Sequence, residues 1–145
     1  KLSISEIINT AAALPSKAEK INFLKANDNL PVRQMLRVMY DPTVEWLLPD
    51  SPPPWKKNSY NDVEGMFYKE TRRLRLFLKG GGYDQHYTTP QGRVKFENLF
   101  ISLLQDIDNN DADLLAFALT KKPVKGLTEA TLLAAYPGLF ETKLA

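Results

Sequence analysis

Short apolar patterns with a helical period recur along this chain, and a capping signal stands before nearly every one of them. Ser3 and Ser16 each lie three residues before a glutamate. In that arrangement the serine oxygen accepts from an exposed N–H at the start of a helix. The two signals predict helices over 5–14 and 17–25, with Pro15 between them. Because no stretch shows sustained alternation of apolar and polar residues, the sequence predicts an all-α fold.

The same reasoning predicts further helices. Pro31 suits the first position of a third helix, since its missing N–H would be unpaired there. Asp41 and Pro42 repeat the order of a capping residue followed by proline, and they predict a short helix through Leu48. The later predictions are a long helix over 61–79 with Val63, Phe67, Leu74, Phe77 and Leu78 inward, one after Thr89-Pro90, one capped by Asn109 or Asn110, and one over 128–135. We expect an irregular bundle of about seven or eight short helices.

A proline-rich connecting segment over 49–58 is the clearest break in this pattern. Three successive prolines, Pro52 to Pro54, cannot continue a helix and favour an extended conformation. The segment is a candidate boundary between two units. Each unit alone would have a thin core, so we expect a single α-helical domain over 1–145, a length at which one domain buries a proper core.

Composition narrows the class of protein. Hydrophobic residues make up 43% and charged residues 25%, which is typical of globular chains. The net charge of +2 is too small to attract nucleic acid or a membrane by itself, so a charge argument must rest on local clusters. The absence of cysteine excludes disulfides, thiolate zinc sites and cysteine nucleophiles. No apolar run is long enough to span a bilayer, so we expect a soluble intracellular protein without a membrane partner.

Four residues of the predicted helix over 61–79, at spacings of four, three and four, would form a basic stripe opposite its apolar face. They are Tyr68, Arg72, Arg75 and Lys79. Guanidinium groups neutralise phosphates and a tyrosine ring stacks on an unpaired base, so one interpretation is a nucleic-acid interface. The other is the solvated outer face that every amphipathic helix needs. The sequence leaves both open.

Two isolated polar residues invite a chemical interpretation. Glu70 falls inside the apolar arc of the same helix, and we expect a structural ion pair with Arg73 or an arginine of another helix. His86, the only histidine, lies near Asp84 in the segment 80–87. One histidine without spaced ligands or a nucleophile predicts neither a metal site nor a catalytic triad. We expect a flexible loop with exposed aromatic side chains.

Carboxylates alternate along the segment 106–113, as they do at the opening of a calcium-binding loop. Asp111 stands where such a loop needs glycine, and Phe117 stands where it needs a bidentate glutamate. Acidic residues also stabilise the N-terminus of a helix through its dipole. We therefore interpret this segment as a helix cap and expect no metal and no cofactor.

Two clusters of large apolar residues are candidates for binding a protein partner. One is Trp55 after the three prolines, and the other is the segment near the end of the chain that holds Tyr136, Leu139 and Phe140. Short apolar segments of this kind dock in grooves of partner proteins. The alternative is that these side chains fold back as core, because large aromatic residues are usually buried.

Several segments spread over the chain resemble a family of small uncharacterised proteins encoded by large contractile-tailed bacteriophages, including those of marine cyanobacteria. These segments are Leu14-Pro15-Ser16-Lys17-Ala18-Glu19-Lys20-Ile21, Met39-Tyr40-Asp41-Pro42, Trp46-Leu47-Leu48-Pro49, Pro52-Pro53-Pro54-Trp55, and Lys125-Gly126-Leu127-Thr128 to Tyr136-Pro137-Gly138-Leu139. The resemblance implies a viral protein made in the cytoplasm of an infected bacterium. It brings no activity and no catalytic residues.

Taken together, these features predict a non-enzymatic phage accessory protein that binds a host or viral protein through Trp55 or the terminal segment. The alternative function is a nucleic-acid-binding accessory of replication or transcription that uses the basic stripe. A structural component of the virion is a third reading. No set of residues has the spacing that an enzyme active site requires, so an enzyme ranks behind the protein-binding and nucleic-acid-binding hypotheses.

Overall fold

The computed structural model describes residues 1–57 and 65–144, and this part of the chain is helical, with no strand beyond one isolated bridge between Trp46 and Leu78. The α-helices are α1 (Ile4–Ala13), α2 (Lys17–Ala26), α3 (Leu30–Tyr40), α4 (Met66–Glu70), α5 (Pro90–Asp106), α6 (Asn109–Ala118) and α7 (Glu129–Ala135). Three short 3₁₀-helices are η1 (Thr71–Phe77), η2 (Asp84–Thr88) and η3 (Leu139–Glu141). The predicted all-α fold is confirmed.

Most of the predicted caps are present. The Ser3 hydroxyl accepts from the N–H of Glu6 at 3.2 Å, and the Glu6 carboxylate accepts from the N–H of Ser3 at 3.0 Å, which is the reciprocal capping box. Thr89 caps α5 in the expected way. The cap of α6 is Asp108, one residue before the predicted asparagines, because its carboxylate accepts two backbone N–H groups and suits the positive end of the helix dipole.

The short helix predicted over 41–48 does not form. The carboxylate of Asp41 accepts from both the N–H and the hydroxyl of Thr43, at 2.9 and 2.7 Å, which turns the chain instead of continuing a helix. Beyond the turn, the N–H of Leu47 donates to the carbonyl of Phe77 at 2.8 Å. The backbone thus finds partners on η1, and the local helix signal is overridden by pairing with a distant segment.

The predicted helix over 61–79 is divided into α4 and η1. Its first residues, 61–64, with Val63, lie outside the described residues. Within η1 the buried side chains Thr71, Leu74 and Phe77 recur every three residues. A 3₁₀-helix has three residues per turn, so this spacing places all three on one side. The tighter winding therefore buries an apolar face that an α-helix would spread out.

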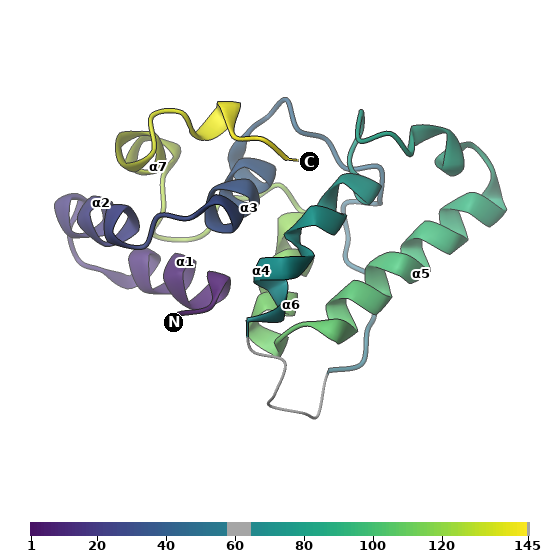
Figure 1. Ribbon diagram of the computed structural model, residues 1–145, viewed down its shortest axis with the longest axis horizontal. Coiled ribbons are helices and arrows are strands. Elements are labelled where there is room, and N and C mark those ends of the chain that lie inside the picture. The colour runs from purple at the N-terminus through teal and green to yellow at the C-terminus, as the bar shows by residue number, and fades with distance from the viewer. Residues whose placement is uncertain (58–64, 145) are drawn as a thin grey trace.

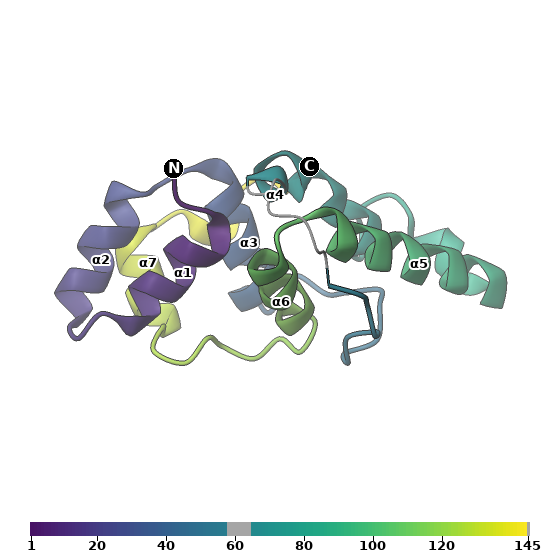
Figure 2. The ribbon, with the colours of Figure 1, turned by 90° about the horizontal axis from the view of Figure 1, so that it is seen from below.

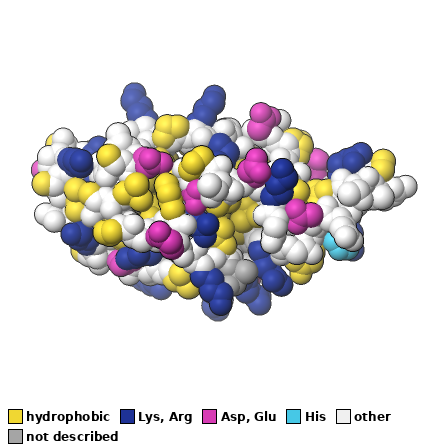
Figure 3. All heavy atoms as spheres, turned by 90° about the horizontal axis from the view of Figure 1, so that it is seen from above, with side chains coloured by type: hydrophobic (Ala, Val, Ile, Leu, Met, Phe, Trp, Pro, Cys, Tyr) yellow, Lys and Arg dark blue, Asp and Glu magenta, His cyan; other side chains and the backbone are white. Residues whose placement is uncertain are grey.

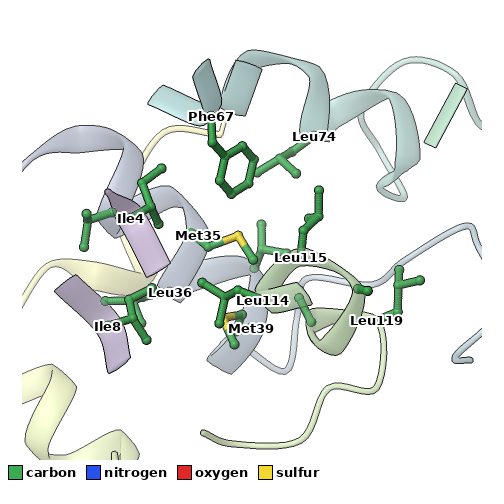
Figure 4. Packing of buried hydrophobic residues seen from close by; sticks show 14 of the residues in the cluster. Ile4, Ile8, Met35, Leu36, Met39, Phe67, Leu74, Leu114, Leu115 and Leu119 are labelled. Carbon is green, nitrogen blue, oxygen red and sulfur yellow. The ribbon is translucent and has the colours of Figure 1, made fainter. Parts of the chain in front are cut away.

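The molecule is elongated, with two groups of helices on either side of α6. Figures 1 and 2 show α1, α2, α3 and α7 gathered at one end, and α5 with η1 and η2 extending toward the other. One hydrophobic cluster takes residues from both sides of the proline-rich segment. In Figure 4, Phe67 and Leu74 point from α4 and η1 toward Met35 of α3 and Leu115 of α6. Residues before and after the proline-rich segment thus share one core, and the single domain over 1–145 stays a prediction.

None of the helices in the described ranges is both long enough and apolar enough to cross a lipid bilayer.

Candidate functional site

Lys121 fixes the irregular path that follows α3. Its ammonium donates to the carbonyl oxygens of Val38, Asp41 and Val44, each at 2.8 Å. Its own backbone has a φ of 56°, a left-handed conformation that costs a non-glycine residue about 1 kcal/mol. Burial lowers the pKa of Lys121, although the charges of Asp41 and Glu45 act to raise it. All three ammonium protons are engaged, so this lysine holds the backbone and has no proton free for a ligand.

An open hollow of about 500 Å³ lies between the end of α3, the segment 42–50 and the end of α6. Its floor is apolar and buried, formed by Met39, Val44, Leu48 and Leu119. Its rim is exposed and carries Pro42, Glu45 and Asp50. Glu45 pairs with Lys79 at 3.3 Å, which leaves Asp50 as the rim charge without a described ion pair. We call this hollow the α3–α6 groove.

The proline-rich segment leaves the α3–α6 groove at Asp50 and reaches Trp55. The side chain of Trp55 is half-buried against the core, so this candidate is partly a packing residue. Its indole N–H is buried and has no acceptor within the described ranges. Pro52 and Pro54 are exposed, and the Lys57 ammonium meets the carboxylate of Asp113 on α6 at 3.2 Å. The segment thus lies along the surface and is held at its far end by α6.

The terminal segment is packed into the fold. Tyr136 and Leu139 have no exposed surface, and the Tyr136 hydroxyl donates to the carbonyl of Leu24 at 2.5 Å. The guanidinium of Arg33 lies 4.6 Å from the centre of the Tyr136 ring. Phe140 is half-buried against the same core. Of the three candidates in this segment, only Phe140 keeps surface that a partner could contact.

The predicted basic stripe does not form one continuous surface. The Tyr68 hydroxyl donates to the carbonyl of Leu2 at 2.5 Å, and its ring lies under the ammonium of Lys1. Lys79 stands beyond the end of η1 and pairs with Glu45. Figure 3 shows Lys and Arg side chains as separate groups, several beside acidic ones. Arg72 and Arg75 lie next to each other, as the predicted stripe requires, but Tyr68 and Lys79 contact other parts of the structure.

Tyr83, which belongs to the segment 80–87 predicted as a loop, lies beside these arginines where the helical pattern predicted Tyr68. The chain reverses at Gly80 to Gly82, where Gly80 and Gly82 have left-handed backbones. Both carboxylate oxygens of Asp84 then accept from the N–H of Gly80 at 3.0 Å. The reversal returns Tyr83 to η1, with the Arg75 guanidinium 5.6 Å from its ring centre. Three adjacent glycines after an arginine-rich helix were the signal for this return.

His86 is part of an aromatic group and has no partner suited to acid–base chemistry in the described structure. Its ring lies 5.0 Å from that of Phe96, and the Tyr87 hydroxyl donates to the carbonyl of Leu76 at 2.7 Å. Of the loop predicted over 80–87, the second half from Asp84 forms helix η2, and the first half up to Tyr83 is a turn outside any helix. Within residues 1–57 and 65–144, no three His, Asp or Glu side chains are grouped so that they could hold a metal ion.

Two predicted structural roles of acidic residues are confirmed. Glu70 pairs with Arg73 at 3.0 Å, as expected for a carboxylate in an apolar arc. In the acidic segment, Asp108 caps α6 and the buried Asp111 accepts from the N–H of Ser5 on α1 at 2.9 Å. The second oxygen of Asp111 has no hydrogen-bond partner in the described ranges. This segment therefore ties α6 to the start of α1.

Comparison with known proteins gives one match. The model of a family of unknown function, DUF6433, matches residues 7–124, which is most of the chain. The chain belongs to the DUF6433 family. No curated protein and no solved structure matches it significantly.

The DUF6433 match covers the α3–α6 groove, η1, η2 and the proline-rich segment. It ends at Val124, before α7 and the terminal segment. The residues of the α3–α6 groove, of η1 and of η2 therefore all lie inside the family region. The residues that cover α2, including Tyr136 and Leu139, lie outside that region.

Proposed function

We propose that this DUF6433 protein is a non-enzymatic accessory protein of a contractile-tailed phage, made in the bacterial cytoplasm, and that it acts by binding a protein partner. The observation that carries the proposal is the α3–α6 groove, with its volume of about 500 Å³, apolar floor and exposed acidic rim. Grooves of this kind receive apolar anchor side chains of a partner, while the polar rim sets orientation.

The chemistry of the groove favours binding over catalysis. The only lysine that lines it in the described structure, Lys121, donates all three ammonium protons to backbone carbonyl oxygens. Its acidic residues, Glu45 and Asp50, are exposed to solvent on the rim. A catalytic group needs a neighbouring base, acid or oxyanion donor in reach of the reacting atom. An apolar floor beneath acidic residues instead suits a partner segment with an apolar anchor flanked by basic residues.

The groove also revises which residues carry the proposal. The proline-rich segment begins at its rim, so a partner seated in the groove would continue toward Trp55. The terminal segment contributes through Phe140 at most, since Tyr136 and Leu139 are buried. A deletion of that segment would test folding as much as binding.

Photo-crosslinking from position 50 in infected cells tests the proposal by identifying the partner protein. Titration calorimetry with that partner, purified separately and not crosslinked, then measures its affinity for the wild type and the variants. We expect Asp50→Lys to weaken binding by about fivefold, because it places a like charge beside the basic partner segment. Glu19→Lys is the matched control, since it makes the same change of charge on α2, which packs against α1 and α7. Equal crosslinking from position 19, or an unchanged affinity of Asp50→Lys, would refute the groove. Recovery of the protein from purified particles would instead indicate a virion component.

A further inference from the structure

A second hollow, separate from the α3–α6 groove, lies between η1 and the start of η2. It has a volume of about 460 Å³ and is lined by Arg72, Arg73, Arg75, Leu76 and Tyr83. The burial of Leu74 and Phe77 fixes which side of η1 faces outward. Three residues of a 3₁₀-helix complete one turn, so Arg72 and Arg75 lie one above the other on that side. We call this hollow the arginine hollow.

The charges around the arginine hollow are unequally neutralised. Arg73 lies between two carboxylates, with Glu70 at 3.0 Å and Asp106 at 3.5 Å. Among the carboxylates of the described residues, Arg72 approaches only that of Glu70, at 4.0 Å, and its side chain is 79% exposed. Arg75 makes no ion pair within the described residues and is exposed. Two guanidinium groups thus retain donors for an anion, and the third is held by the protein itself.

The aromatic side of the arginine hollow is held by ring packing and hydrogen bonds. Tyr83 lies 5.9 Å from both His86 and Phe96, and Phe96 is buried on α5. The hydrogen bonds of Asp84 to Gly80 and of Tyr87 to Leu76 tie η2 to η1. Tyr83 therefore keeps its half-exposed ring beside the arginines without a ligand, and a ligand would not have to order it first.

We propose that the arginine hollow binds single-stranded nucleic acid, with Arg72 and Arg75 on phosphates and Tyr83 stacked on a base. Aromatic rings beside backbone-binding cations are the general means of holding an unpaired strand without sequence preference. A duplex offers phosphates but hides the faces of its bases, so it would use only the arginines. The site is distinct from the proposed partner groove and does not depend on it.

The proposal predicts a specific salt dependence. Two phosphate contacts on a single strand give a slope of log affinity against log salt of about −1.4. Fluorescence anisotropy of a labelled 12-nucleotide oligothymidine across a salt series measures this slope with the full chain. We expect Arg72→Gln with Arg75→Gln to lower the affinity about tenfold or more at low salt and to bring the slope near zero. Lys17→Gln with Lys25→Gln removes the same charge from α2 and is expected to leave both quantities unchanged.

The tyrosine is tested separately. Tyr83→Leu is expected to lower the affinity about fivefold or more at every salt concentration without changing the slope, and Tyr83→Phe is expected to keep the affinity. Circular dichroism and thermal denaturation of each variant check that the overall helical content and stability are retained.

Absence of salt-dependent binding by the wild type, equal losses in the Lys17 and Lys25 control, or equally tight binding of a duplex of the same length would each overturn the proposal. Asp50→Lys should not affect oligonucleotide binding, so this test and the test of the α3–α6 groove fail independently.

Discussion

Asp111 is a carboxylate in a buried position that only half satisfies it. One oxygen accepts from the N–H of Ser5, and the other has no partner among the described residues. Burial raises the pKa of Asp111, and the charges of Asp108 and Glu6 add to the effect, although hydrogen bonds from Ser5 oppose it. The folded protein therefore holds a proton on this group more readily than the unfolded chain does.

This shift gives a prediction with a definite sign. A carboxyl group whose pKa is raised on folding favours the folded state at low pH, and that contribution is lost as the pH rises above the ordinary value of 3.8. Asp111→Asn cannot ionise, so its free energy of unfolding should rise relative to that of the wild type as the pH increases above 3.8. Urea denaturation of both proteins at several pH values measures the difference.

Asp113→Asn is the control for this experiment, because Asp113 lies on the same helix but is exposed and meets Lys57. It should not show the same trend. A difference between Asp111→Asn and the wild type that stays constant with pH would contradict the buried, raised carboxyl group.

At the scale of an element, Gly92 permits the close approach of α5 to η2. A Cβ atom on Gly92 would lie 1.7 Å from the carbonyl oxygen of His86 and 3.0 Å from the hydroxyl of Thr89. Neither the backbone of η2 nor the cap of α5 can yield without breaking the aromatic group around Phe96. The glycine is therefore required for packing, although its own backbone is ordinary helix.

Gly92→Ala should destabilise the protein by about 2 kcal/mol, since overpacking costs more than the gain in helix propensity returns. It should also weaken oligonucleotide binding, because Tyr83 would move with η2. Thermal denaturation and anisotropy measure the two effects. Ser102→Ala, an exposed substitution in the same helix, should leave both nearly unchanged. A stable Gly92→Ala variant would show that η2 is not held as described.

The helices were predictable from sequence to the extent that their signals are local. Ser3, Ser16, Thr89 and Thr128 each mark a helix start by a hydrogen bond to a residue three positions on. The failed helix over 41–48 had the same local signals, but its backbone pairs with η1 and its carbonyl groups accept from Lys121. Nothing near position 41 in the sequence shows that a lysine 80 residues later will satisfy these groups.

The candidate sites were less predictable for the same reason. The basic stripe assumed an α-helical period, and the change to a 3₁₀-helix at Thr71 kept Arg72 and Arg75 together but removed their neighbours. Tyr83 comes to lie beside Arg75 because the chain reverses after η1, and the spacing of residues along a helix cannot predict a contact made by such a reversal. The α3–α6 groove joins the continuous stretch 39–50 to Leu119 and Lys121, which lie far along the chain, so its residues share no local pattern.

At the scale of the whole molecule, the terminal segment closes the end of the structure formed by α1, α2 and α3. The side-chain amide of Gln34 donates to the carbonyl of Lys143 at 3.0 Å, and the guanidinium of Arg37 donates to that of Thr142 at 2.6 Å. Leu139 fills the space beneath these contacts without any exposed surface. The segment is thus part of the core and holds α3 in place.

Leu139→Ala should lower the free energy of unfolding by about 3 kcal/mol, the usual cost of removing a fully buried leucine side chain. Amide hydrogen exchange should accelerate in α2, α3 and α7 and stay slow in α5, which lies at the other end of the molecule (Figure 1). Glu141→Ala, an exposed change in the same short helix, should have little effect on either measurement. A loss within 0.5 kcal/mol for Leu139→Ala would mean that the segment only rests on the surface.

The packing of α7 on α2 can form only late during synthesis on the ribosome. Tyr136, which binds the carbonyl of Leu24, is translated 112 residues after it. At bacterial and eukaryotic elongation rates this interval is roughly 6 to 20 seconds. Throughout that time α1, α2 and α3 of the nascent chain are not yet packed against α7 and Tyr136, so their apolar side chains remain exposed to the cell. Helices α1, α2 and α3 are therefore completed only when the later segment that covers them has been made, and until then their apolar side chains are a surface that a ribosome-associated chaperone would meet.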